Sequence, residues 1–140
     1  MQSPATTEQH FAKRTDSLEA IFGFVSEFAA SHGVSEDVTA EMHFVVEEVF
    51  TNMVRYNQES QDDVSVRLSL ESGSFLVSLA DHNVHSFDPN SRPPVDITKP
   101  LHERTPGGLG IHLIREMMDE VRYEYENRTA RITLVKHLEK

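Results

Sequence analysis

The order in which helical and strand-like hydrophobic repeats follow one another constrains the fold of this chain more than any other feature. Two early stretches, residues 18–28 and 38–53, repeat apolar side chains at helical spacing. Gly33 is expected to end the first helix, and Ser35 to open the second, which should end near Asn57. The chain therefore begins its core with a pair of amphipathic helices.

Strand-like alternation follows the helices. Residues 64–70 and 75–79 alternate apolar with polar side chains on either side of Ser72-Gly73. This pattern predicts a β-hairpin with one buried face. The other expected elements are a short first strand at 9–14, a third helix at 111–121, and a second hairpin formed by 121–125 and 131–135.

These elements predict one domain over residues 1–140, in which helices and strands are segregated along the chain. Such an order favours an α+β fold: a two-layer α/β sandwich with a mixed sheet covered by helices on one face. Residues 83–106 interrupt the pattern, with many prolines and few large apolar side chains. A segment of this length without periodicity is commonly a functional lid or a mobile loop.

Composition excludes several classes of protein. The chain has no cysteine, which rules out disulfides, thiol catalysis and cysteine-bound zinc. Its formal net charge is −10, with 13 Lys and Arg against 23 Asp and Glu, which argues against non-specific nucleic-acid binding. No apolar run approaches the roughly 18 residues of a membrane span, and the first residues lack a secretory signal, so we expect a cytoplasmic protein.

Three glycines stand close together in the stretch RTPGGLGIHLI, at Gly107, Gly108 and Gly110. One interpretation is a tight turn between two elements. The other is a glycine loop that opens a helix, whose unpaired backbone N–H groups and dipole favour an anion such as a phosphate. The stretch alone supports both.

The second predicted helix carries the stretch VVEEVFTNMVRYN. Glu48 and Asn52 are one turn apart on one face beside the apolar stripe, whereas Glu47 points toward solvent. A carboxylate and a carboxamide placed this way can bind hydrated Mg²⁺ or position a nucleophile. An ordinary surface glutamate with a helical asparagine is the alternative.

The second hairpin strand ends in LADHNVHSFDP. Asp81 can accept a hydrogen bond from an exocyclic amine, or simply start an Asx turn. His82 and His85, with Asp81 and Asp88 nearby, could instead form a transition-metal site.

In this order, E-x-x-x-N, a strand-ending Asp with FDP, and GGLG resemble the N-box, G1 box and G2 box of the GHKL ATPase superfamily, which includes gyrase, Hsp90, histidine kinases and MutL. Within it the chain is most similar to the stand-alone anti-sigma factor serine kinases of the RsbW and SpoIIAB type. The tail PGGLGIHLIREMMDEVRYEY, followed by ITLVK, carries most of that likeness.

The resemblance implies ATP and Mg²⁺ as cofactors and assigns roles to three residues. Glu48 would be the base toward the incoming serine hydroxyl, Asn52 would coordinate Mg²⁺, and Asp81 would accept the adenine amino group. The further residues that it assigns to the nucleotide are Phe87 in the FDP sequence, Arg104 toward the γ-phosphate, Gly107, Gly108, Leu109 and Gly110 at the phosphates, and Thr129 beside the adenine.

The chain departs from the family pattern at four places. The G1 box usually reads D-x-G-x-x-F-D-P, but here Asn83 replaces the glycine and the spacing from Asp81 to Phe87 is one residue longer. Asparagine tolerates the left-handed backbone that a glycine there would adopt. Tyr56 stands where relatives often have histidine, and Arg128-Thr129 replaces the usual Gly-Thr.

The resemblance implies a serine/threonine protein kinase that acts as an anti-sigma factor and phosphorylates a STAS-domain anti-anti-sigma factor. Its partners would be that protein, a sigma factor and a second copy of itself, with neither nucleic acid nor membrane. The alternative is a catalytically weakened module of the same fold that sequesters a sigma factor or another regulatory protein. A domain of this fold class with no nucleotide role is the third hypothesis.

Overall fold

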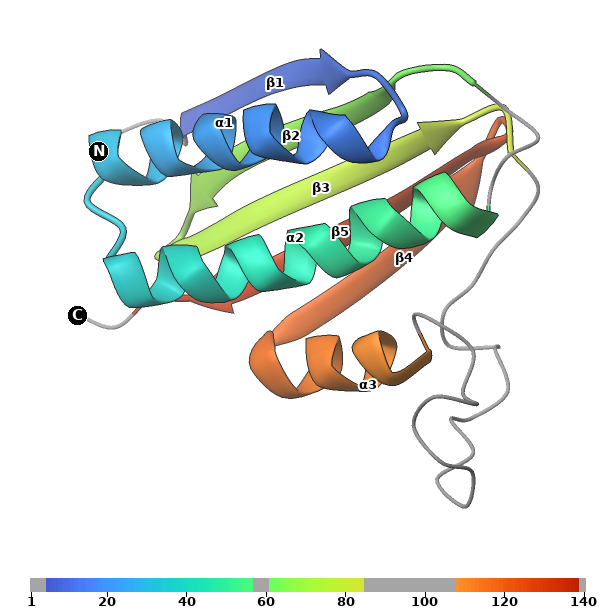
Figure 1. The fold of residues 1–140 in the computed structure, drawn as a ribbon. Coiled ribbons are helices and arrows are strands. Elements are labelled where there is room, and N and C mark those ends of the chain that lie inside the picture. The colour runs from blue at the N-terminus through green and yellow to red at the C-terminus, as the bar shows by residue number, and fades with distance from the viewer. Residues whose placement is uncertain (1–4, 57–60, 85–107, 139–140) are drawn as a thin grey trace.

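A computed structural model describes residues 5–56, 61–84 and 108–138, and these form one sheet with helices packed on one of its faces (Figure 1). No helix in these ranges is long and apolar enough to cross a membrane. The elements in chain order are β1 (Ala5–Phe11), the 3-10 helix η1 (Thr15–Ser17), α1 (Leu18–Ser31), α2 (Glu36–Tyr56), β2 (Val64–Glu71), β3 (Ser74–His82), α3 (Gly108–Met117), β4 (Glu120–Glu126) and β5 (Thr129–His137).

The five strands lie in the order β1-β2-β3-β5-β4, and every pairing among them is antiparallel. The two-layer sandwich is confirmed, but the expectation of a mixed sheet was wrong. The connection from β3 through α3 to β4 leaves those two strands parallel in direction. They are not neighbours, because β5 lies between them and is antiparallel to both. Whether a sheet is mixed or antiparallel depends on the order of its strands, and hydrophobic periodicity along the chain does not specify that order.

The core fills the space between the helices and one face of the sheet. The alternating residues of the β2–β3 hairpin, including Val66, Leu68, Val77 and Leu79, are fully buried against α1 and α2. On the other face the hairpin carries small hydroxyl groups, and Ser78 Oγ lies 2.8 Å from Thr133 Oγ1 of β5. The helices pack on the face of the sheet that carries the large apolar side chains.

The turn between α1 and α2 follows the predicted signals. Gly33 has a φ of 74°, and the Val34 N–H donates to the Ala29 carbonyl at 2.9 Å, the pattern that ends a helix with a left-handed residue. Ser35 then caps α2, since its Oγ accepts from the Val38 N–H at 3.2 Å. These two caps fix where the helices meet over the sheet.

The first strand differs most from its prediction. It covers Ala5–Phe11 rather than 9–14, and Phe11 is its one buried residue. The strand lies at the sheet edge, where half of its side chains face solvent, so its hydrophobic pattern is weak. Its position is fixed by the register with β2, which pairs Ala5 with Leu70 and Phe11 with Val64.

One lysine ties α3 and α2 to β5. The Lys136 ammonium donates to the Met117 carbonyl at 2.8 Å, at the C-terminal end of α3, and lies 3.2 Å from a Glu41 carboxylate oxygen of α2. A cation at this end satisfies an unpaired carbonyl and opposes the negative end of the helix dipole. Lys136 therefore helps to fix the position of α3 against the sheet.

A histidine is enclosed where α1 meets α2. The His43 ring centroid lies 4.8 Å from that of Phe22, and its Nε2 lies 3.1 Å from Ser26 Oγ. Burial lowers the pKa of His43 from its usual 6.5, against the opposing effect of a hydrogen bond with the Phe22 backbone. The stability that the neutral ring contributes is therefore present above pH 6.5 and is lost as the pH falls through the folded-state pKa.

Replacing His43 should accordingly make stability less dependent on pH. We expect the free energy of unfolding of the wild type to fall more than that of His43→Gln between about pH 7 and pH 5, because only the wild type loses this contribution. Urea unfolding at both pH values measures the difference. His10→Gln, on an exposed side chain of β1, is the control. Equal pH dependence of wild type and His43→Gln would contradict the assignment.

Candidate functional site

The elements that carry the three predicted nucleotide motifs meet at one end of the sandwich. The C-terminal half of α2, the N-terminus of α3 and the end of β3 all lie at the end of the sheet drawn on the right of Figure 1. Helix α2 packs directly against α3. The three sequence motifs that are far apart in the chain thus occupy one region.

Asp81 is the most deeply enclosed polar residue of this region. Its side chain has no exposure to solvent, and its Oδ1 lies 2.8 Å from the ammonium of Lys13, whose side chain is 2% exposed. Asp81 continues the helix-facing set of β3, after Leu79 and Val77. A buried carboxylate is costly unless it is paired, so the ion pair explains how the strand can end in an aspartate.

Glu48 and Asn52 lie on α2 as predicted from their spacing. Both side chains are half-buried, whereas Glu47 is exposed. Phe50, between them in sequence, is fully buried and anchors this part of the helix in the core. An oxygen-bearing pair one turn apart, held at the edge of the core, suits a hydrated Mg²⁺ ion bound to phosphates.

The backbone enters the left-handed region two residues after Asp81. Asn83 has a φ of 59°, which confirms the left-handed conformation expected where relatives have glycine. Its side-chain amide donates to the Asp62 carboxylate. The next residue, Val84, is held on both sides, since its N–H donates to the Arg128 carbonyl at 3.0 Å and its carbonyl accepts from the Tyr125 hydroxyl at 2.8 Å.

The glycine stretch opens a helix. Helix α3 begins at Gly108, so Gly108, Leu109 and Gly110 form its first turn, where backbone N–H groups have no partner within the helix. This supports the anion-binding interpretation over a simple turn. Phe87, Arg104 and Gly107 lie outside the described residues, as do His85, Asp88 and the side chain of Tyr56.

The structure does not bring Thr129 to the other residues. In the β3–β5 register Thr129 pairs with His82 and Ala130 pairs with Asp81, so Thr129 lies on the face of the sheet opposite to Asp81. Its hydroxyl is 3.3 Å from His82 Nδ1, and His82 Nε2 is 2.8 Å from Ser65 Oγ. His82 is thus engaged with two hydroxyls, and no cluster of three or more metal-binding side chains occurs among the described residues.

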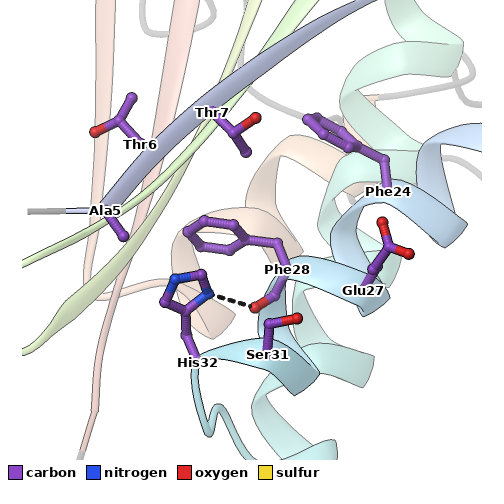
Figure 2. A pocket seen from close by; sticks show the side chains of 8 residues that line it. All are labelled: Ala5, Thr6, Thr7, Phe24, Glu27, Phe28, Ser31 and His32. Carbon is purple, nitrogen blue, oxygen red and sulfur yellow. Dashed lines mark hydrogen bonds between the residues drawn. The ribbon is translucent and has the colours of Figure 1, made fainter.

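A separate cavity of about 500 Å³ lies at the opposite end of the sheet (Figure 2). The start of β1 and the second half of α1 form it, and Phe28 and His32 are among the residues that line it, with the His32 ring nitrogen 2.9 Å from the Phe28 carbonyl. Of the predicted nucleotide residues that the structure describes, none lines this cavity, so it is distinct from their site.

Lys13 is the residue of this region that sequence reasoning missed. It follows β1 directly and belongs to no motif, and nothing in the sequence connects it with Asp81. The sequence offered one weak indication of its role, a lysine placed between an apolar strand residue, Phe11, and the start of a helix.

Comparison with known proteins identifies the fold family. The sequence profile of the histidine kinase-like ATPase domain matches residues 11–136. The chain is 29% identical over 120 residues to the serine-protein kinase RsbW of Bacillus velezensis, an alignment that covers 81% of this chain and 74% of that protein. It is 28% identical over 99 residues to RsbW of Bacillus thuringiensis, covering 67% of this chain and 61% of that protein.

Solved structures agree on the fold. A structure of the RsbU and RsbW domains of a Mycobacterium tuberculosis protein is similar over 97% of this chain and 33% of that chain, with a TM-score of 0.69 and 14% sequence identity. A SiaB–SiaC complex from Pseudomonas aeruginosa contains a chain similar over 92% of this one and 88% of its own length, with a TM-score of 0.63 and 13% identity. At these identities the likeness concerns the architecture alone.

Proposed function

Because the chain belongs to the histidine kinase-like ATPase domain family, we propose that it is an ATP-dependent serine/threonine protein kinase that acts as an anti-sigma factor. Its substrate would be a STAS-domain anti-anti-sigma factor, and a sigma factor its second partner. The observation that carries the proposal is the buried, ion-paired Asp81 near the end of β3, because this end of the strand lies at the same end of the sandwich as the start of α3 and the half of α2 that carries Glu48 and Asn52. The kinase names of the RsbW relatives support it.

The residues present suit Mg-ATP. Asp81 would accept the adenine amino group, the backbone of Gly108 to Gly110 would face the phosphates, and Asn52 would hold Mg²⁺. When bound, Mg²⁺ neutralises phosphate charge and helps to align the transferred group. Glu48 would accept the proton of the attacking serine hydroxyl. Arg104 would meet the γ-phosphate, and Phe87 would lie in the nucleotide loop.

Partner sequestration without efficient transfer is the second candidate function. The extra residue between Asp81 and Phe87 favours it, because it alters the loop that follows the adenine-binding aspartate. The left-handed Asn83 weighs against it, since the backbone there adopts the conformation that a glycine at this position would favour. In both candidates a homodimer would be the working form, and the cytoplasm its location.

Calorimetric titration with ATP, with and without Mg²⁺, tests the proposal. We expect saturable binding that Mg²⁺ strengthens. Transfer of labelled phosphate from ATP to a STAS-domain protein would then separate the two candidates. The chain has no tryptophan, so intrinsic fluorescence is a poor substitute. Undetectable binding under both conditions would contradict the nucleotide site, and binding without transfer would favour sequestration.

A further inference from the structure

Lys13 is held in place by the turn that carries it. The Arg14 N–H donates to the Ala12 carbonyl at 2.8 Å, the Ser17 hydroxyl donates to the same carbonyl at 2.8 Å, and the Ser17 N–H donates to the Arg14 carbonyl at 2.9 Å. The turn therefore fixes the backbone on both sides of the lysine. A long side chain pays less conformational entropy to stay buried when its backbone is already ordered.

The surroundings of Asp81 make Lys13 its close cationic neighbour. Across the sheet Asp81 pairs with Ala130 of β5, and on β2 the pair of Ser65 with Ala80 is followed by Val64; both Ala130 and Val64 are buried and apolar. The charged groups on the other elements packed at this end are more exposed: Asp16 of η1, and Glu48 and Arg55 of α2. Because neither side chain is open to solvent, the ammonium at 2.8 Å helps to offset the desolvation of the carboxylate.

We propose that Lys13 is a positioning residue for base recognition: it keeps the enclosed Asp81 ionised, so that Asp81 acts only as a hydrogen-bond acceptor and selects a 6-amino purine over a 6-oxo purine. The inference rests on the proposed nucleotide site. An ionised carboxylate has no proton to donate, so it pairs with the amino group of adenine and repels the carbonyl oxygen of hypoxanthine. A protonated carboxyl could donate a hydrogen bond to that oxygen, and Asp81 would then no longer discriminate between the two purines.

The first test needs no nucleotide. In Lys13→Met the buried carboxylate lacks its cation, so its pKa should rise above the unfolded value. The stability of such a group is present below the unfolded pKa and is lost as the pH rises through the folded pKa. We expect the midpoint temperature of unfolding of Lys13→Met to lie about 10 °C or more below wild type at pH 8, and the gap to narrow toward pH 5.

Two further variants keep this test decisive. Lys13→Arg should restore the stability and its pH profile, since it returns the charge. The double variant Lys13→Met with Asp81→Asn should differ from wild type in stability by an amount that does not change with pH over this range, and it should fold even if Lys13→Met does not, because it removes both charges of the pair. A constant gap between Lys13→Met and wild type from pH 5 to pH 8 would overturn the proposal.

The second test measures selectivity by titration with ATP and with inosine triphosphate. The wild type should prefer ATP by about 100-fold at both pH 6 and pH 8, since a mismatched acceptor faces an ionised carboxylate. Lys13→Met should lose most of that preference at pH 6 and regain part of it at pH 8. A merely structural lysine would weaken both nucleotides equally at both pH values, and that result would also overturn the proposal.

The two tests separate this inference from the proposed function. If the wild type binds neither nucleotide, the proposed function fails, while the pH-dependent unfolding of Lys13→Met still decides whether Lys13 keeps Asp81 ionised. If the wild type binds both nucleotides equally, or if Lys13→Met binds ATP more tightly at every pH, then the lysine does not support base selection and the inference fails.

Discussion

Glu48→Gln is expected to bind Mg-ATP as the wild type does and to phosphorylate a STAS-domain substrate about 100- to 10,000-fold more slowly. The amide has nearly the same shape as the carboxylate but cannot take the hydroxyl proton. Since Glu48 is half-buried on α2 beside the fully buried Phe50, the substitution should leave the fold intact. Single-turnover transfer of labelled phosphate measures the rate, and calorimetry measures the affinity.

The neighbouring glutamate supplies a matched control. Glu47→Gln makes the same chemical change one residue earlier, on a side chain that is exposed. It should transfer phosphate at close to the wild-type rate. If Glu47→Gln is the inactive variant and Glu48→Gln the active one, the base has been assigned to the wrong residue.

Asn52→Ala should weaken ATP binding in the presence of Mg²⁺ by about 10- to 100-fold and should change binding without Mg²⁺ much less. The carboxamide oxygen is the proposed ligand, and alanine offers no oxygen in its place. Because Asn52 is only half-buried, its removal leaves no large cavity and should affect unfolding little. Titration with ATP in magnesium and in a chelator gives both affinities.

Asn52→Asp is the matched variant for this prediction, because it keeps an oxygen at the same position on α2. It should retain Mg²⁺-dependent binding that Asn52→Ala loses. Equal losses in magnesium and in chelator for Asn52→Ala would show that the residue contacts the nucleotide directly, or supports the helix, without holding the metal.

The helices and the central hairpin could be predicted from the sequence, since their signals are local. Gly33 and Ser35 specify the turn between α1 and α2, and the alternation on either side of Ser72-Gly73 specifies the hairpin. The sequence also predicted a helix after the glycines, although α3 begins at Gly108 rather than at residue 111. Local hydrogen bonding decides each of these features.

The features that could not be predicted depend on pairings between distant parts of the chain. The sheet is antiparallel because β5 lies between β3 and β4, and no local sequence signal specifies this strand order. The same register sends Thr129 to the face opposite Asp81. Lys13 meets Asp81 only because β1 ends at the same side of the sandwich as β3. The motif residues were found because their chemistry is specific, and their ion-pair partner was missed because it has no motif.

The strand order also has a consequence for how each new copy of the protein is made. Strand β3 has one neighbour, β2, joined to it by a two-residue turn, and a second, β5, that follows much later in the chain. During synthesis the β2–β3 hairpin can form early, but one edge of β3 stays unpaired until residues 129–137 leave the ribosome. An unpaired edge invites association with other strands. The interval between the synthesis of β3 and that of β5 is therefore the period in which a nascent copy is most exposed to mispairing.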